Sequence, residues 1–175
     1  MNMISRLRAK FGGTMASPQR ASLARTMIGC MGGTIGIGLL AFLTHFFNTT
    51  LLMAPFGATC VLLFAVPDAP LSQPRNVIGG HIVATAIGLG AVHLLPSISP
   101  IGMGVTVGLA IAAMQLTRTV HAPAGADPLV VLALGPTVPW SFLLTPVLVG
   151  SIVLVVIALA LNNVESGSKW PKYWL

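Results

Sequence analysis

Two short sequences of the form Pro-x-Gly-Ala stand beside the residues of this chain that could bind a charged solute. They are Pro55–Ala58 and Pro123–Ala126. Proline removes a backbone donor and glycine weakens a helix, so each sequence predicts a short or broken helix. The free N–H groups at the start of a short helix form an anion site. We therefore expect an anion site at these two sequences, formed by Pro55, Gly57, Ala58, Pro123, Gly125 and Ala126.

Two arginines lie close in sequence to these elements and could supply positive charge. Arg75, which Asn76 follows, precedes one apolar stretch, and Arg118 ends another. A guanidinium group is a planar cation with several donors, which suits a small anion. The alternative is that both arginines anchor helix ends at the lipid headgroups, as Lys and Arg often do. The sequence leaves both interpretations open.

Ionisable residues within apolar segments are costly and are therefore functional candidates. His121 lies two residues before the first residue of the second Pro-x-Gly-Ala element and Asp127 directly follows that element, whereas His81 lies inside an apolar stretch. Histidine titrates near neutral pH, so His121 could bind an anion when protonated or carry a proton. His45 and His93 lie near segment ends, where an interfacial ring is the simpler interpretation.

The sequence argues against an enzyme. It has no phosphate-binding loop, no Gly-x-Ser-x-Gly elbow and no His-Glu-x-x-His helix. Three acidic residues leave little for acid–base catalysis, and the histidines are not spaced as a metal site. Cys30 and Cys60 both fall in apolar stretches and read as small buried residues. We expect no catalytic residue, no metal and no cofactor.

The elements that position these residues must lie in a membrane. The chain is 55% hydrophobic and only 7% charged, which excludes a soluble domain, since such domains carry about 25% charged residues. The ranges 26–67, 76–117 and 128–164 contain no charged residue. Each is long enough for roughly two crossings of a hydrocarbon core about 30 Å thick. Three such blocks predict six membrane segments.

Uncharged turn candidates divide each block near its middle, at 48–50, 96–100 and 135–139. The second and fifth segments are short, and each is associated with a Pro-x-Gly-Ala element. They read as broken or re-entrant helices. The six expected segments are Thr26–Phe47, Leu51–Val66, Asn76–Leu95, Ile101–Thr117, Leu129–Val138 with the residues before it, and Ser141–Leu161.

Positive charge predicts the orientation. If all six segments cross and the N-terminus is inside, every Lys and Arg lies on the cytoplasmic side, as the positive-inside rule requires. The alternative has four crossings and two re-entrant segments. Residues 1–25 read as a basic cytoplasmic tail, although a weak organelle-targeting peptide has a similar composition, and residues 163–175 read as a second cytoplasmic tail. Anionic lipid explains the basic balance better than nucleic acid does.

An internal repeat is visible when residue 55 is placed over residue 123. Each half then reads as a long helix, a Pro-x-Gly-Ala element with a short helix, and another long helix, over about 26–95 and 100–162. With three crossings per half the second copy runs opposite to the first, which is typical of transporters. Chance matching of Gly, Ala and Pro strings is the alternative. Small residues at helical spacing predict a compact bundle and a homo-oligomer.

The ordered motifs Ala54–Ala58, Gln73–His81 and Thr117–Ala126 resemble the HPP family of integral membrane proteins, from about residue 25 to the C-terminal Trp170–Trp174. Members of that family are linked to nitrite transport, so the resemblance implies a small monovalent anion as solute. The chain departs from the family pattern at Ala122 in the naming motif and at Asp127-Pro128. A carboxylate beside an anion site lowers anion affinity unless it is protonated or points away.

These observations predict an all-α, multi-pass protein of the cell inner membrane with one transmembrane domain over residues 26–162. The expected function is transport or channel conduction of a small inorganic anion, with nitrite first, and the expected partners are membrane lipid and further copies of the chain. The alternative is a membrane module that transports nothing and packs against or regulates a partner protein.

Overall fold

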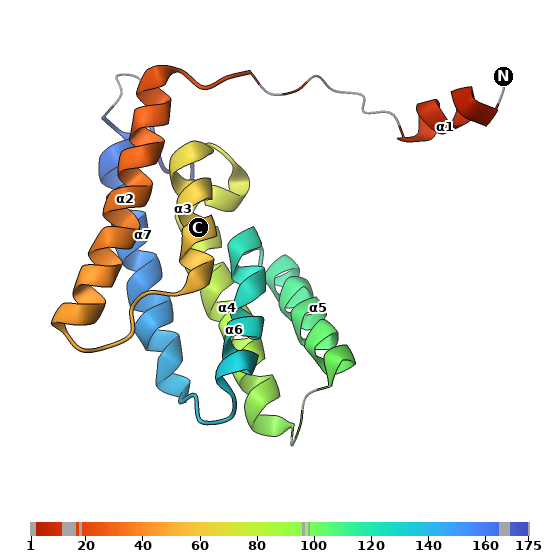
Figure 1. Ribbon diagram of the computed structural model, residues 1–175, viewed down its shortest axis with the longest axis vertical. Helices are drawn as coiled ribbons and strands as arrows, with labels where there is room; N and C mark the ends of the chain where they lie inside the picture. Colours follow the sequence, from red (N-terminus) through yellow and green to blue (C-terminus); the bar gives the residue numbers. More distant parts are fainter. Residues whose placement is uncertain are drawn as a thin grey trace.

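The computed structural model of this protein is helical in the part of the chain that it describes, residues 3–11, 17, 19–95, 97, 99–164 and 169–174, and no strand occurs there. The α-helices are α1 (Met3–Phe11), α2 (Leu23–Phe46), α3 (Ala54–Ala65), α4 (Pro74–Leu94), α5 (Pro100–Leu116), α6 (Asp127–Leu134) and α7 (Val149–Asn162) (Figure 1). Short 3-10 or π turns are η1 (Pro70–Ser72), η2 (Ala122–Ala126), η3 (Trp140–Leu143) and η4 (Leu144–Leu148).

The helices have the length and composition of membrane segments. Three are long and apolar enough to cross a bilayer, namely α2, α4 and the stretch Trp140–Asn162 that includes α7. The other apolar helices are shorter and comprise α3, α5 and Ala122–Leu134. Large apolar side chains such as Phe42, Leu94 and Ile101 are more than half exposed. An exterior of this kind fits a bilayer and confirms the prediction of an all-helical membrane protein.

From α2 to α7, successive helices run in alternating directions, so successive connections lie at opposite ends of the bundle. The turns that follow α2, α4 and α6 lie at one end of the bundle in Figure 1 and carry no charged residue. The connections that follow α3 and α5 lie at the opposite end, with the start of α2 and the residues after α7. These connections hold Asp68 and Arg118. Apart from Asp127 in the interior, the described charged residues of the helical bundle therefore gather at one end.

Proline residues stand in the first turns of α3, α4, α5 and α6. Pro55 and Pro74 stand in the first turns of α3 and α4, where a missing N–H costs nothing. The second Pro-x-Gly-Ala sequence forms the 3-10 turn η2, which leads directly into α6. The fifth segment is therefore Asp127–Leu134 after η2, earlier than the expected Leu129–Val138.

The sixth segment contains a kink that the hydropathy pattern does not predict. Thr145 has non-helical backbone angles (φ −135°, ψ 113°), and α7 begins only at Val149. The physical reason is Pro146, because a proline disfavours helical angles in the residue before it and lacks its own N–H.

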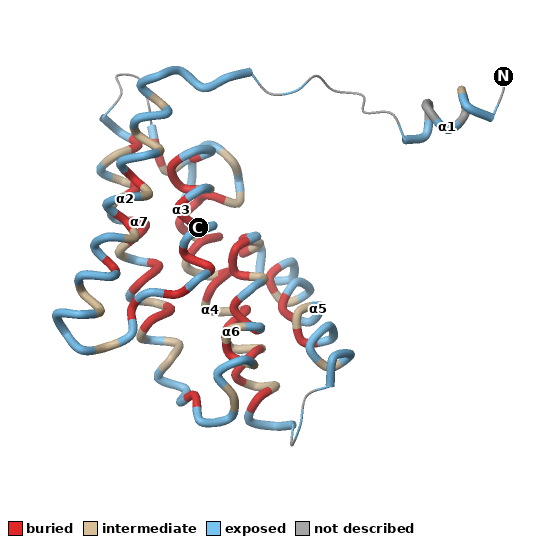
Figure 2. Tube along the Cα trace, viewed as in Figure 1, coloured by how far each residue is buried: buried red, intermediate tan, exposed pale blue. Residues whose placement is uncertain are grey.

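Helix α4 lies at the centre of the bundle and contacts α5, α6, η2 and α7. Helix α2 packs on α3 and α7, and α5 packs on α4 and α6. Figure 2 shows α4 buried or partly buried along most of its length, α6 buried on one side, and the outer sides of α2 and α5 exposed. Small residues permit the close contacts, since Gly32 lies against the ring of Phe64 and Gly150 against the ring of Phe56. The predicted packing role of such residues is thus confirmed at these contacts.

Candidate functional site

Five polar side chains meet in the interior where α3, α4, η2 and α6 converge. None of them is exposed: Thr59, His81, Thr85, His121 and Asp127 all have a relative exposure of 0%. Thr59 comes from α3, His81 and Thr85 from successive turns of α4, His121 from the residue before η2, and Asp127 from the first position of α6. We call these five residues the buried network.

The members of the network are joined by hydrogen bonds into one continuous chain. Nδ1 of His121 lies 2.7 Å from the carbonyl oxygen of Leu71, and its Nε2 lies 3.0 Å from Oγ1 of Thr59. The same hydroxyl lies 2.8 Å from Nε2 of His81. Nδ1 of His81 then lies 2.7 Å from Oδ2 of Asp127. The chain thus runs from a backbone carbonyl to a buried carboxyl group.

The Leu71 carbonyl fixes the direction of these hydrogen bonds. A carbonyl only accepts, so Nδ1 of His121 carries the proton and, in a neutral ring, Nε2 accepts from the Thr59 hydroxyl. The Thr59 hydroxyl has one proton, so it must accept from Nε2 of His81. The other acceptor near Thr59, the Pro55 carbonyl, is more distant at 3.3 Å. One proton therefore lies between Nδ1 of His81 and Oδ2 of Asp127, which makes the network neutral overall.

Asp127 has one oxygen engaged and one free. Oδ2 accepts from Thr85 at 3.2 Å as well as contacting His81. Oδ1 is buried and has no hydrogen-bond partner within the described part of the chain. A buried polar atom without a partner is costly, and such atoms concentrate at functional sites. A role in stabilising the fold therefore does not explain why Oδ1 of Asp127 is buried without a partner.

Glycines of α4 allow the segment 117–121 to approach closely enough to place His121. A Cβ atom at Gly80 would lie 2.6 Å from Cβ of His121 and 2.8 Å from the carbonyl oxygen of Thr119. One at Gly79 would lie 2.6 Å from the Thr119 side chain. Asn76 also donates from Nδ2 to the Val120 carbonyl at 2.8 Å. Together these contacts hold His121 against α4.

The arginines lie at a helix end, apart from the buried network. Arg75 donates to the carbonyl oxygens of Thr117 (3.0 Å) and Arg118 (3.2 Å), just beyond the last turn of α5. Arg118 is exposed and has a positive φ of 56°. The position of Arg75 matches the anchoring alternative, and a part for either arginine in anion binding stays a prediction.

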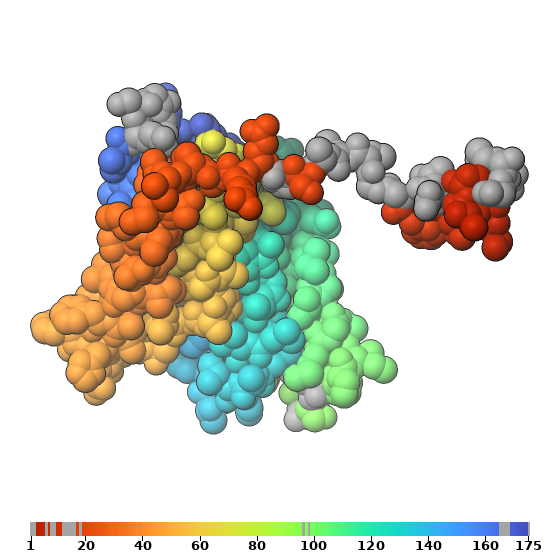
Figure 3. Space-filling view, turned by 45° about the horizontal axis from the view of Figure 1, so that its top comes forward, coloured from red at the N-terminus to blue at the C-terminus, as the bar shows by residue number. Residues whose placement is uncertain are grey.

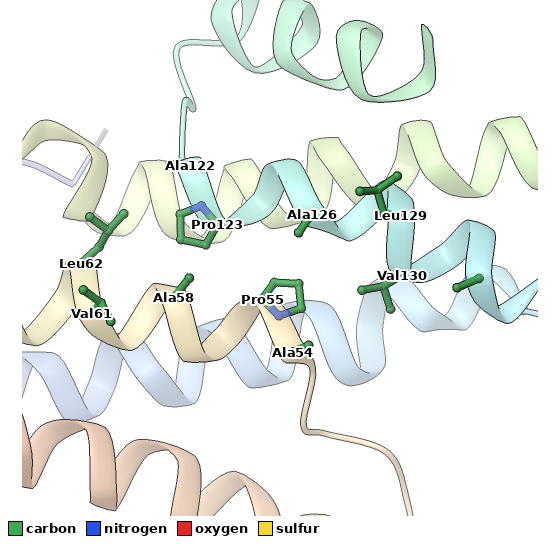
Figure 4. Close-up of a pocket in the computed structure, with 11 residues that line it drawn as sticks. Ala54, Pro55, Ala58, Val61, Leu62, Ala122, Pro123, Ala126, Leu129 and Val130 are labelled. Atoms are coloured by element: carbon green, nitrogen blue, oxygen red, sulfur yellow. The ribbon is translucent and has the colours of Figure 1, made fainter. Parts of the chain in front are cut away.

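The two Pro-x-Gly-Ala elements face each other across an apolar groove. Figure 4 shows α3 and the η2–α6 segment running in opposite directions on its two sides. The groove has a volume of about 850 Å³, and Pro55, Ala58, Pro123 and Ala126 contribute to its lining. A Cβ at Gly57 or Gly125 would meet no atom of the described residues within 4 Å. Four of the six predicted residues thus line the groove, and anion binding by the backbone amides of the two elements stays a prediction.

The structure brings three of the predicted site residues together, namely His81, His121 and Asp127. Sequence reasoning missed Thr59 and Thr85. Thr59 lies one turn after Pro55 and Thr85 one turn after His81, so helical spacing from the chosen residues was the available signal. Among the described residues no group of three His, Cys, Asp or Glu side chains is placed to hold a metal ion.

The C-terminal residues are attached to the connection between α3 and α4. Trp170 is buried and donates from Nε1 to the Pro67 carbonyl at 3.1 Å. The backbone N–H of Lys172 donates to Oε1 of Gln73 at 2.8 Å, and the Tyr173 hydroxyl lies 2.8 Å from Oδ1 of Asn76. The same connection supplies the Leu71 carbonyl that binds His121, so the C-terminal segment supports one end of the network.

Comparison with known proteins gives one family and two relatives. The HPP transmembrane region matches residues 18–171. Two proteins of Dictyostelium discoideum, named only as transmembrane proteins, are each 32% identical to the chain. One aligns over 175 residues (94% of this chain, 56% of the relative) and the other over 130 residues (70% and 45%). The chain thus spans about half the length of these curated relatives. No solved structure matches it.

Proposed function

Because this chain belongs to the HPP family of transmembrane proteins, we propose that it transports a small inorganic anion across a membrane, with nitrite as the first candidate. The observation that carries the proposal is the buried network. Ionisable side chains inside apolar segments are costly and mark solute or proton pathways. The network lies where the two Pro-x-Gly-Ala elements meet the central helix α4, which is where a transported solute would have to pass.

The packing supports an inverted repeat of the kind found in transporters. Helices α2, α3 and α4 correspond in order to α5, η2–α6 and α7. If each helix is replaced by its counterpart, the α2–α3 contact becomes the α5–α6 contact. In the same way the α2–α7 contact becomes the α5–α4 contact, and all four contacts are present. Figure 3 shows α3 and α6 in the middle of one face, flanked by α2 and α5. The groove between the two short helices would then lie near the pseudo-two-fold axis.

The charge distribution favours an anion over a cation. At the end of the bundle nearest His121, Arg75 lies in the first turn of α4, Arg118 lies in the connection after α5, and Lys172 is bound to Gln73 next to α4. Positive charge at one mouth raises the local concentration of anions. Inside, the network offers histidine N–H and threonine O–H donors against a single carboxyl group. Protonation of that group would remove its repulsion of an anion.

The test is anion flux into proteoliposomes that contain the purified protein. Nitrate should be measured beside nitrite and formate, because the latter two are weak acids that cross lipid bilayers unaided in their neutral form. We expect His121→Ala to reduce the protein-dependent flux at least tenfold. The matched control is His93→Gln, whose ring lies on α4 outside the network and bonds the Leu89 carbonyl. Flux no greater than that of empty liposomes for all three anions would exclude the proposal.

The second candidate is a membrane module that transports nothing. The observation in its favour is that the network is closed to solvent, with its five side chains fully buried. The two candidates differ in ligand binding, since a ligand that binds the folded state raises its stability by mass action. Stabilisation by nitrite or nitrate, lost in His121→Ala, supports transport. The absence of any anion effect, together with no flux, supports the module.

A further inference from the structure

We propose that Asp127 is the proton-carrying group of this transporter and that His81, Thr59 and His121 pass protons between its carboxyl group and the α3–α4 connection. This inference rests on the proposed function, because it adds a coupled proton to the anion. The supporting geometry is an unbroken chain of hydrogen bonds no longer than 3.0 Å from the Leu71 carbonyl to Oδ2 of Asp127.

The chain of groups leads from one end of the bundle toward the middle of the membrane. Leu71 belongs to η1 in the α3–α4 connection and is partly exposed. At 1.5 Å per residue, His81 lies roughly 10 Å and Thr85 roughly 16 Å along α4 from Pro74, in a helix roughly 31 Å long. Asp127, which binds both side chains, is therefore near the middle of α4. Protons would enter at a surface connection and reach a carboxyl group at mid-depth.

Each transfer exchanges one N–H or O–H bond for another. To unload, Thr59 gives its hydroxyl proton to Nε2 of His121 and takes the Nε2 proton of His81. His121 releases its Nδ1 proton to water that enters at the connection once the Leu71 carbonyl, which holds that proton in this conformation, has moved aside. The proton formerly shared stays on Nδ1 of His81, and Asp127 remains a carboxylate. One proton has left and the network has changed from neutral to one net negative charge; loading is the reverse.

This change of charge couples the proton to the anion. A network with a net negative charge repels an anion in the low-dielectric interior, whereas the loaded neutral network does not. Binding a proton and a monovalent anion together adds no net charge to the protein. The expected mechanism is therefore symport of one proton with one anion, which moves no net charge across the membrane.

On the far side of Asp127 the interior is apolar and closes the path. A Cβ at Gly88, one turn after Thr85 on α4, would lie 2.8 Å from Cα of Pro128, so α4 and α6 are in close contact there. The apolar cluster of Leu89, Val92, Val131 and Val138 follows. In this conformation the carboxyl group thus connects only to the α3–α4 end of the described bundle. Transport requires a second conformation in which α4 and α6 separate at Gly88.

Among the described residues, the ionisable group in contact with Asp127 is His81, and His121 connects to it through Thr59 and an edge-on contact with the His81 ring. His81 comes from α4 and His121 from the residue before η2. Helices α5 and α7 contain no charged or ionisable residue. On α3, Cys60 faces α2, because its Sγ lies 3.3 Å from a Cβ built at Gly36. The titration of Asp127 should therefore depend on His81 and His121.

The experiment measures nitrate uptake into proteoliposomes under an imposed pH gradient or an imposed potassium diffusion potential. We expect uptake by the unmodified protein to rise at least tenfold with a pH gradient, acid outside, and to ignore the potential. Asp127→Asn should lose the response to the pH gradient. The matched control Asp68→Asn removes an exposed carboxylate of the α3–α4 connection that pairs with Lys172, and it should behave as the unmodified protein.

The outcomes separate this inference from the proposed function. Uptake driven by the potential and indifferent to the pH gradient overturns proton coupling and leaves anion transport standing. If no anion moves, nitrogen-15 NMR of the histidine rings in the purified protein still decides the proton relay. Asp127→Asn should change the ring-nitrogen chemical shifts of His81 and His121 and leave those of His45 and His93 unaltered. Identical ring-nitrogen spectra for all four histidines in both proteins overturn the inference.

Discussion

At the scale of single residues, Thr59 is the connection on which the buried network depends. Among the described side chains, its hydroxyl is the group that hydrogen-bonds to both histidines, at 2.8 Å and 3.0 Å. A hydroxyl can donate to one ring while accepting from the other, which neither an apolar side chain nor a cation can do. The proton shared by His81 and Asp127 is therefore isolated from His121 whenever this oxygen is removed.

We expect Thr59→Val, which keeps the side-chain shape, to lower proton-driven nitrate uptake at least tenfold. It should also destabilise the fold by at least about 1–3 kcal/mol, because it leaves Nε2 of both buried histidines without a partner. Thr59→Ser is the matched control, since it restores the hydroxyl. Uptake and thermal unfolding in detergent measure the two effects. Equal uptake by the valine and serine variants would contradict a relay through this oxygen.

The sequence identifies only part of this site, for physical reasons. His81, His121 and Asp127 stand out because ionisable groups are rare in apolar segments. Thr59 and Thr85 do not, because threonine is common in membrane helices and only the partner across the bundle reveals its use. Arg75 and Arg118 are close to the Pro-x-Gly-Ala elements in sequence, but the backbone turns at Arg118 and leaves the Arg75 guanidinium at the end of α5.

At the scale of elements, the distance between α4 and its neighbours is set by glycine. At Gly80, the His121 side chain and the Thr119 carbonyl occupy the space that a side chain at this position would need. At Gly90, on the same helix, a Cβ would meet no atom within 4 Å in the described part of the chain. Replacing glycine by alanine at both positions therefore separates the effect of a close helix contact, at Gly80, from the effect of helix propensity, at Gly90.

Gly80→Ala should destabilise the fold by about 1–3 kcal/mol and displace His121, because a backbone carbonyl cannot move aside as a side chain can. Gly90→Ala should leave stability unchanged or raise it by up to about 1 kcal/mol, since alanine is the better helix former. Thermal unfolding in detergent compares the two. A neutral Gly80→Ala would mean that the 117–121 segment is not held against α4.

The C-terminal segment offers a second comparison of this kind. Trp170 is 4% exposed and Trp174 is 56% exposed, and both belong to the segment that contacts the α3–α4 connection. Trp170→Ala should cost about 3–5 kcal/mol, as buried aromatic truncations do, and Trp174→Ala should cost little. Proton-driven uptake should fall with the first variant, because the Leu71 end of the network loses its support. Similar melting temperatures for both variants would show that the segment is not anchored.

At the scale of the whole molecule, the sequence predicts the all-helical membrane class well but not the helix ends. Long uncharged blocks reveal membrane segments because charge is excluded from hydrocarbon at every position. The starts of α3 and α6 and the kink at Thr145 depend on where a proline meets its neighbours in space. The homo-oligomer also stays a proposal, since it concerns surfaces that a single chain leaves uncovered.

The outer face of α5 is where we expect copies of the chain to meet. Gly104, Gly108 and Ala112 are exposed in a row, and no atom of the described residues lies within 4 Å of a Cβ built at either glycine. Small residues at this spacing allow helices to approach closely in a membrane. Gly108→Leu should shift the assembly toward monomers in native mass spectrometry, whereas Gly38→Leu, an exposed glycine of α2, should not. A monomeric unmodified protein would refute the expectation.

The orientation of the bundle decides the side from which Asp127 receives its proton. The positive-inside rule assigns the end with Arg75 and Arg118 to the cytoplasm. A protein with Cys30→Ala and Cys60→Ala can carry one new thiol, at exposed Thr137 or at Asp68. In right-side-out vesicles an impermeant maleimide should label Thr137→Cys at once and Asp68→Cys only after lysis. The reverse pattern would place the relay opening outside. With the expected pattern, the proton path in this conformation opens to the cytoplasm, and import requires separation of α4 and α6 toward the opposite side.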